Sequence, residues 1–137
     1  MKVKDLYGNI SNWKIKGQII SSASDNRHRS NLHIQARNIL YELFPTTLIL
    51  EEVPINTKPG ITQYFDFYIN KIKMAIEVHG PQHFKFNKLF HSSARDFLNQ
   101  RKLDSDKREW CKINNITLIE LSFNEKIEEW KKKIEHR

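Results

Sequence analysis

The sequence predicts an α/β fold with a central, mixed, four-stranded sheet flanked by helices. Four short segments have the β-branched and aromatic composition of strands, and three longer segments repeat apolar residues at helical spacing. Along the chain they occur in the order helix, strand, strand, strand, helix, strand, with a closing helix at the end. That order predicts a mixed sheet with helices on its faces.

The first helix and the first strand have clear boundary signals. Residues 30–45, "SNLHIQARNILYELFP", carry apolar residues on one helical face, with Ser30 as an N-cap and Pro45 as a stop. This pattern predicts a helix of about four turns. Residues 46–55, "TTLILEEVPI", form the first strand, and Pro54 marks its end or a sheet edge. Residues 56–60, "NTKPG", have the composition of a turn.

The next two strands form a hairpin, and the remaining elements follow it. Residues 61–69 and 72–80, "ITQYFDFYI" and "IKMAIEVHG", are predicted strands joined by a tight turn, and residues 81–92 are irregular. A helix is expected at 93–114, a short buried strand at 116–121 and a closing amphipathic helix at 124–137.

Length and composition favour one compact domain. The chain has 137 residues and 39% hydrophobic content, which suits a single core. We expect an N-terminal arm and loop over 1–29 and one domain over 30–137. The only cysteine, Cys111, excludes an internal disulfide and a cysteine-based zinc cluster, so we interpret it as a packing residue.

The charge balance points to a polyanionic partner. Lys and Arg number 23 against 16 Asp and Glu, giving a net charge of +7 and a pI near 9.5. Nucleic acid is the first expectation and a membrane surface the second. No apolar run approaches the roughly 20 residues that span a bilayer, and the N-terminus lacks a signal-peptide core. A soluble, cytoplasmic protein is expected.

Two carboxylates stand in strands that should be buried. Strand alternation predicts that Asp66 shares a face with Tyr64 and Tyr68, opposite Phe65, Phe67 and Ile69. In the next strand it predicts a shared face for Ala75, Glu77 and His79. If the two faces match across the hairpin, the side chains that converge are Asp66, Glu77 and His79.

Converging carboxylates need a shared proton or a hard divalent cation. Magnesium bound beside a phosphodiester would polarise the phosphoryl oxygen and help to generate a hydroxide, so a basic protein with this site is interpreted as a nuclease. The alternative is a surface hairpin whose polar residues face water. The neighbouring "EVHGPQHF" favours the site, because it adds two histidines and a glutamine near Glu77.

The stretch "FDFYINKIKMAIEVHGPQHF", followed by "DSDKREWCKINNITLIEL", resembles the core of the PD-(D/E)XK nuclease superfamily. The resemblance covers residues 30–122 and implies a restriction-endonuclease-like αβββαβ core. It implies that Asp66 and Glu77 bind Mg²⁺, with Mn²⁺ as a substitute and the Val78 carbonyl as a third ligand. His79 stands where the family's lysine is expected, as in the very-short-patch-repair and EDxHD homing endonucleases.

The histidine leaves open which residue activates the water. His79 can act as a general base near neutral pH, and Gln82 and His83 are alternatives on the following loop. His33 takes the place where many family members carry a helical glutamate. It could orient water, contact phosphate or simply pack.

Three further residues have supporting roles in this interpretation. Glu52 is favoured over Glu51 as the acid that faces the site, with an ordinary solvent-facing acid as the alternative. Asp104 and Lys107 adjoin on one helical face, where family members often show an acid and a base, although a local salt bridge explains the pair equally well.

Basic residues that follow the hairpin predict contacts with the phosphates of double-stranded DNA. The expected contacts are His83, Lys85, Lys88, Arg95, Arg101 and Lys107. No appended DNA-reading motif is evident, and a homodimer could cut both strands. The prediction is a metal-dependent DNA endonuclease. The alternatives are a non-catalytic nucleic-acid-binding domain and a structural or inhibitory protein whose basic face binds an acidic partner.

Overall fold

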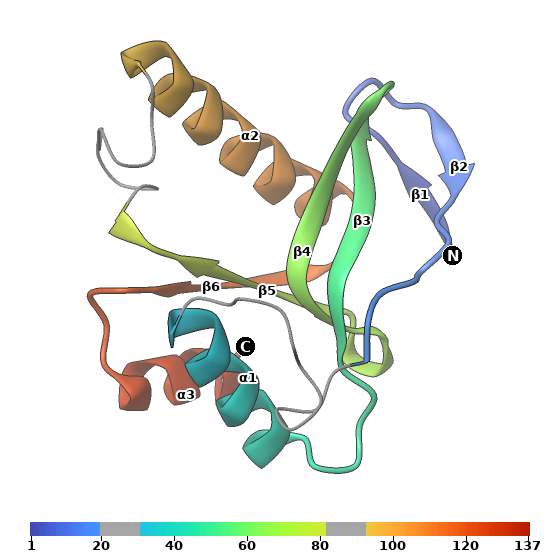
Figure 1. Ribbon diagram of the computed structural model, residues 1–137. Helices are drawn as coiled ribbons and strands as arrows, with labels where there is room; N and C mark the ends of the chain where they lie inside the picture. Colours follow the sequence, from blue (N-terminus) through green and yellow to red (C-terminus); the bar gives the residue numbers. More distant parts are fainter. Residues whose placement is uncertain (20–30, 82–92) are drawn as a thin grey trace.

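A computed structural model describes residues 1–19, 31–81 and 93–137 (Figure 1). Its main sheet has the strand order β3-β4-β5-β6. The strands are β3 (Leu50–Lys58), β4 (Ile61–Ile69), β5 (Met74–His79) and β6 (Thr117–Ser122). Neighbouring strands are antiparallel from β3 to β5, whereas β5 and β6 are parallel. The predicted mixed four-stranded α/β fold is therefore confirmed.

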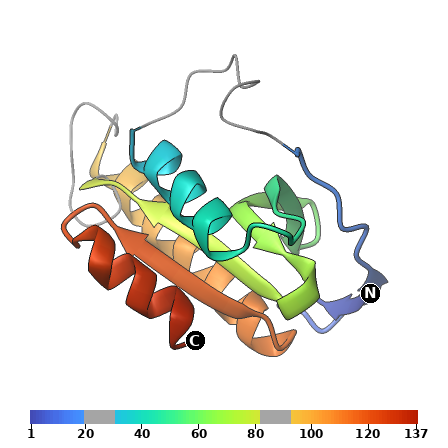
Figure 2. The ribbon, with the colours of Figure 1, turned by 90° about the horizontal axis from the view of Figure 1, so that it is seen from below.

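The helices cover both faces of this sheet (Figures 1 and 2). Helices α1 (Asn31–Leu43) and α3 (Ile127–Glu135) lie on one face, and α2 (Ala94–Ile113) lies on the other. The parallel β5–β6 pair requires a crossover connection, which α2 provides. Within the described residues, no helix is long and apolar enough to cross a membrane.

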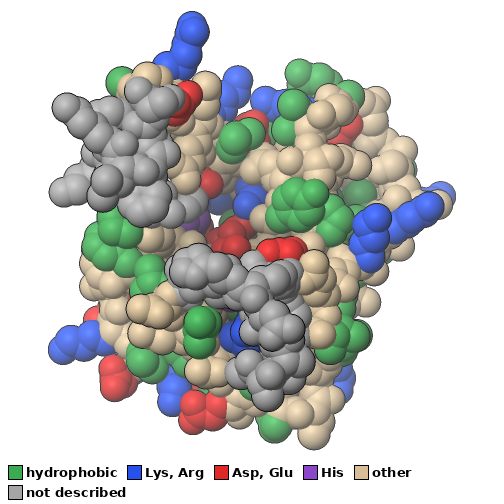
Figure 3. Space-filling view, viewed as in Figure 1, with side chains coloured by type: hydrophobic (Ala, Val, Ile, Leu, Met, Phe, Trp, Pro, Cys, Tyr) green, Lys and Arg blue, Asp and Glu red, His purple; other side chains and the backbone are tan. Residues whose placement is uncertain are grey.

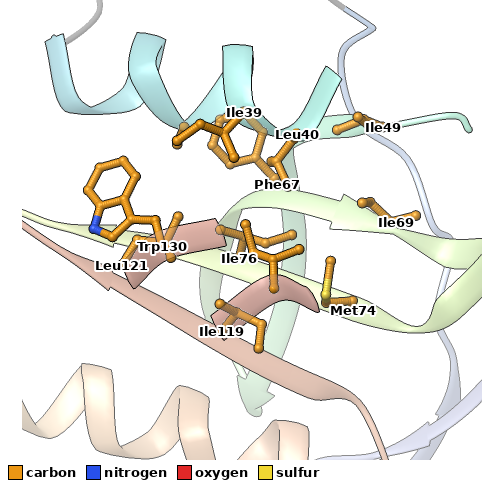
Figure 4. Close-up of a cluster of buried hydrophobic side chains, with 12 residues drawn as sticks. Ile39, Leu40, Ile49, Phe67, Ile69, Met74, Ile76, Ile119, Leu121 and Trp130 are labelled. Atoms are coloured by element: carbon orange, nitrogen blue, oxygen red, sulfur yellow. The ribbon is translucent and has the colours of Figure 1, made fainter. Parts of the chain in front are cut away.

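The first core cluster fills the space between the sheet and helices α1 and α3 (Figure 4). Leu40 of α1 and Trp130 of α3 are almost fully buried there, against β4, β5 and β6. The indole Nε1 of Trp130 donates a 3.0 Å hydrogen bond to the Ser122 carbonyl, so the polar atom of this large side chain is satisfied.

The second core cluster lies between the sheet and α2 and includes the N-terminal segment. Trp13 packs edge-on against Trp110 of α2, with ring centroids 5.3 Å apart, and against Tyr68 of β4 at 4.9 Å. Cys111 is buried beside them, and burial raises the pKa of its thiol to about 12. Its predicted packing role is confirmed.

The N-terminal segment is joined to the edge of the main sheet at two places. It contains a small two-stranded sheet of β1 (Lys2–Lys4) and β2 (Ile10–Asn12). The Leu6 amide donates to the Thr57 carbonyl at 2.8 Å, and Gln18 and Glu51 exchange two backbone bonds at 2.8 Å. Part of the expected arm therefore shares the core of the domain.

The predicted bounds of two strands were wrong. Strand β3 begins at Leu50 instead of residue 46 and continues through Pro54 to Lys58, so only Pro59 and Gly60 make the turn. Pro54 lies on an edge strand, which was one of the two predicted explanations for it, and there a missing N–H costs no sheet hydrogen bond. The second hairpin strand begins at Met74, since Asn70–Ile72 form a short 3-10 helix that ends at Lys73 with φ of 48°.

The predicted alternation also fails at one level of the β3–β4 hairpin. Glu52 has φ of 54°, and Leu50 and Val53 on either side of it pack in the same cluster. On β4, Phe65 packs in the second cluster and Phe67 in the first, so these two side chains do not share a face. The buried side chains of both strands change sides at this level. The register pairs Glu51 with Phe67 and Val53 with Phe65, and Glu52 and Asp66 lie between these two pairs.

Candidate metal and phosphodiester site

Asp66 lies where β4 and β5 separate. Their pairing ends with Phe67 opposite Ile76, so Asp66 and Glu77 would form the next pair if the ladder continued. Instead, the Val78 amide donates a 2.8 Å hydrogen bond to Asp66 Oδ2. The carboxylate thus replaces a strand partner at the point where the two strands diverge (Figure 1).

Glu77 is buried next to Asp66, with only 7% of its surface exposed. Burial raises the pKa of the Glu77 carboxyl well above its usual range, and the negative charge of Asp66 raises it further. The convergence of these two acids that the sequence predicts is present in the structure. Because the two carboxylates repel each other, a positive charge placed beside them would be stabilising.

Lys107 brings a cation to this pair from α2. Its Nζ contacts Glu77 Oε1 and donates a 2.8 Å hydrogen bond to the Tyr64 carbonyl. The lysine therefore joins the helix to both hairpin strands. Asp104, one helical turn earlier, lines the same small crevice as Glu77 and Lys107.

His79 belongs to a second polar group on β5. His79 is buried, and its Nε2 lies 2.8 Å from Glu120 Oε1 on the neighbouring parallel strand. Arg108 holds the same carboxylate, with Nε at 2.9 and 3.1 Å from its two oxygens. The hydrogen bond from His79, followed by that from Arg108, lowers the pKa of Glu120 to about 2.

The sequence interpretation missed Glu120 and Arg108. A signal was present, because Glu120 is an acid inside the apolar run "ITLIEL", which is the same anomaly that singled out Asp66 and Glu77. The parallel register places Glu120 directly beside Glu77. Only the strand order shows that the two acids are neighbours.

His33 lies on the α1 side of the sheet, apart from the Glu77 and Lys107 contact. It stacks on Phe67 with centroids 4.5 Å apart, and its Nε2 is 2.7 Å from Glu51 Oε1. Arg37 completes this buried group through Nε at 2.7 Å from Glu51 Oε2. Although burial opposes ionisation, His33 and Arg37 lower the pKa of Glu51 overall.

On β3, Glu51 is therefore the fully buried acid, whereas the sequence interpretation had favoured Glu52 as the inward-facing one. Glu52 is half-buried and lines a cleft between the N-terminal segment and β3. Of the predicted DNA contacts, Arg95 and Arg101 are exposed on α2, and the Arg101 guanidinium lies 5.8 Å from the Phe97 ring centre. Lys107, also a predicted DNA contact, is half-buried against Glu77. The predicted contacts His83, Lys85 and Lys88 and the predicted catalytic residue Gln82 fall outside the described ranges.

The donor set suits a hydrated Mg²⁺ better than a closed metal cage. Among residues 1–19, 31–81 and 93–137, no cluster of three His, Cys, Asp or Glu side chains is arranged to hold a metal. Magnesium needs only one or two protein carboxylates, because it keeps several waters. Asp66 and Glu77 are the two carboxylates that could hold such an ion, and Lys107 already contacts the Glu77 oxygen.

Acidic and basic side chains lie close together on one face of the molecule. Figure 3 shows Asp and Glu side chains in the middle of this face, with Lys or Arg and His side chains close to them.

Comparison with known proteins finds similarity to viral proteins. The chain is 43% identical over 61 residues to uncharacterized protein 307L of Invertebrate iridescent virus 6, which covers 44% of this chain and 31% of that protein. It is 34% identical over 73 residues to uncharacterized protein 094L of Frog virus 3, covering 53% and 47%.

The matched region is only part of each viral protein. With uncharacterized protein 033L of Invertebrate iridescent virus 3, the identity is 33% over 72 residues, covering 53% of this chain and 37% of the relative. The chain thus spans less than half the length of these curated relatives. No family model matches the sequence, and no solved structure matches the fold.

Proposed function

We propose that this chain is a metal-dependent DNA endonuclease that hydrolyses phosphodiester bonds. The observation that carries the proposal is the convergence of Asp66 and Glu77 at the divergence of β4 and β5, with the Lys107 ammonium on Glu77. Two acids and a cation at a small, largely buried crevice of a basic protein fit a phosphodiester better than a neutral substrate.

The residues divide the expected chemistry between them. Asp66, Glu77 and the Val78 carbonyl would hold Mg²⁺, which when bound would polarise the phosphoryl oxygen and lower the pKa of a bound water. Lys107 is placed to stabilise negative charge that develops beside Glu77. His79, oriented by Glu120, is positioned to hold or move a proton at its ring nitrogen.

Lys107 also addresses the departure from the PD-(D/E)XK pattern. In that pattern the lysine follows the glutamate on one strand, whereas here His79 occupies that position and turns toward Glu120. The ammonium that contacts Glu77 comes from α2 instead. We infer that Lys107 takes the part of the missing strand lysine.

The same contact favours a second candidate function. Because Lys107 already neutralises Glu77, the acid pair has a counter-ion without any metal. A non-catalytic nucleic-acid-binding domain would keep this ion pair for stability alone. The two functions differ in whether the pair is needed for bond cleavage.

Cleavage of supercoiled plasmid in Mg²⁺ tests the proposal directly. We expect nicked or linear product with the wild-type chain, and loss of product with EDTA and in Asp66→Asn, Glu77→Gln and Lys107→Met. Glu128→Gln is the matched control, because it removes one carboxylate charge from an exposed position on α3. Cleavage that survives Asp66→Asn would refute the metal assignment, and retarded mobility without cleavage would favour the binding domain.

The wider substrate and assembly are separate parts of this proposal. Double-stranded DNA is the proposed target, and a homodimer would let two sites cut both strands. Plasmid nicking that converts to linear product only as protein concentration rises would support the dimer. A panel of duplex, branched, mismatched and RNA substrates would define the substrate class.

A further inference from the structure

A cleft of about 640 Å³ lies between the N-terminal segment and the edge of β3. The segment touches β3 at Leu6 and at Gln18, and the cleft opens between these two attachments. Gly17 permits the close approach at one end, since a Cβ there would lie 2.8 Å from the Glu51 carbonyl oxygen. The volume is within the range of roughly 300–1,000 Å³ that is usual for ligand sites.

One wall of the cleft is basic. Along the extended stretch after β2, Trp13 and Ile15 pack into the second core cluster, while Lys14 and Lys16 are exposed and line the cleft. The alternation therefore presents two ammonium groups on one side of a backbone that is fixed by a buried tryptophan. Among the described lining residues, Glu52 is the one acid.

The opposite wall is aromatic and polar. Tyr64 lines it with 56% of its surface exposed, beside Thr62 and Asn56. Trp110 also contributes to the lining, and its buried Nε1 has no hydrogen-bond partner among the described residues. An exposed tyrosine facing two lysines offers a ring for a base and charges for phosphates.

Among the described residues, the cleft and the carboxylate crevice have no lining residue in common, but Tyr64 links them. The Tyr64 carbonyl accepts the Lys107 hydrogen bond, and Lys107 contacts Glu77. Tyr64 therefore joins the wall of the cleft to the Lys107–Glu77 contact.

We propose that this cleft binds an unpaired strand of DNA that flanks the scissile phosphate. Lys14 and Lys16 contact successive phosphates, and Tyr64 stacks on a base. An unpaired strand fits better than a duplex, because a base stacks on Tyr64 only when its own neighbours are displaced. The inference rests on the proposed function for the position of the scissile bond, whereas strand binding itself does not require cleavage.

Binding of a labelled oligo(dT) of about 12 nucleotides, followed by fluorescence anisotropy in EDTA, tests the inference. We expect Lys14→Ala/Lys16→Ala to weaken binding and to reduce the slope of log K against log salt by about 1.4, since each phosphate contact on a single strand contributes about 0.7. Tyr64→Ser should weaken binding about tenfold, and Tyr64→Phe should restore it.

The control is Lys126→Ala/Lys132→Ala, which removes the same charge from exposed positions in and before α3. It should leave the salt slope unchanged. An equal loss in both double variants, a wild-type slope in Lys14→Ala/Lys16→Ala, or the same losses with an acidic peptide in place of DNA would overturn the inference. Because EDTA prevents cleavage, strand binding without later plasmid cleavage would refute the endonuclease and leave the cleft assignment standing.

Discussion

Asp66 combines a structural contact with an electrostatic one. Its Oδ2 accepts the Val78 amide, which fixes the carboxylate at the end of the β4–β5 ladder. Its charge also raises the pKa of Glu77, after the larger effect of burial. A substitution that keeps the hydrogen bond but removes the charge separates these two contributions.

Asp66→Asn is that substitution. The amide oxygen still accepts the Val78 N–H, and the repulsion of Glu77 is gone, so we expect the metal-free protein to gain about 1 kcal/mol of stability, or roughly 4 °C in Tm. We also expect the wild-type Tm to rise on adding Mg²⁺ and the variant Tm to stay constant. Thermal unfolding followed by circular dichroism, with Glu109→Gln at an exposed position of α2 as the control, measures both. A variant that still responds to Mg²⁺ would contradict the role of Asp66 as a ligand.

The pH dependence of stability should report on Glu120. Its folded pKa of about 2 is below the ordinary glutamate value of 4.5, so its pairing with His79 and Arg108 stabilises the fold above about pH 4.5. This stability is lost as the pH falls from about 4.5 to about 2. We expect Glu120→Gln to be less stable than wild type at pH 7 and to approach it near pH 2.5. Equal Tm differences at both pH values would argue against the ion-paired carboxylate.

At the scale of the elements, the β3–β4 pair owes its shape to a local backbone change. Glu52 adopts a left-handed conformation, and the inward face of each strand changes at this level. As a result Glu51 points to α1, where it joins His33 and Arg37. Regular alternation would instead have placed Glu51 on the same face as Val53, and Phe67 on the same face as Phe65.

Glu52→Gly tests the cost of that conformation. A left-handed L-residue costs about 1–2 kcal/mol, and glycine in a strand costs about 0.5–1 kcal/mol through the unfolded chain. We therefore expect a net gain of about 0.5–1 kcal/mol in urea unfolding with an unchanged m-value. Glu52→Val, which is β-branched, should be destabilising. If Glu52→Gly also keeps plasmid cleavage, the conformation of residue 52 matters to the site and its carboxylate does not.

Helix α2 connects the strands and also supplies the site with charge. Its Trp110 and Cys111 pack in the second core cluster, which fixes the rotation of the helix. Lys107 and Arg108 lie one turn earlier and reach Glu77 and Glu120. Lys107, which the sequence placed beside Asp104 on the helix, thus reaches both hairpin strands.

At the scale of the whole molecule, the N-terminal segment completes the second core cluster. Trp13 is buried against Tyr68 and Trp110, and its Nε1 donates to the Pro54 carbonyl at 2.9 Å. Because it closes over the edge strand β3, it also protects backbone groups that could otherwise pair with another chain.

Trp13→Ala should consequently destabilise the whole domain and not only the N-terminal segment. We expect a loss of about 3–5 kcal/mol in the free energy of unfolding, as for other buried tryptophans. Chemical denaturation followed by circular dichroism measures it, with Tyr7→Ala, a substitution of an exposed aromatic in the same segment, as the control. A loss below about 1 kcal/mol would indicate that the segment folds independently of the sheet.

The sequence by itself determined the element order, the mixed sheet and the prominence of Asp66 and Glu77. Amphipathic periodicity and strand composition are local properties, and an acid within an apolar strand is anomalous wherever that strand packs. The predicted orientations of Glu52 and of the β4 side chains were less accurate. The prediction assumed a regular strand, and Glu52 departs from that conformation.

Only the tertiary structure decided which groups meet the two acids. Lys107 lies 30 residues from Glu77 in sequence, and Glu120 lies 41 residues from His79. Neither contact leaves a local pattern in the sequence. The Glu120–His79 contact depends on the parallel β5–β6 register, and the Lys107–Glu77 contact depends on the rotation of α2. The same holds for the cleft beside Tyr64, whose walls come from segments that meet only when Trp13 is buried in the core.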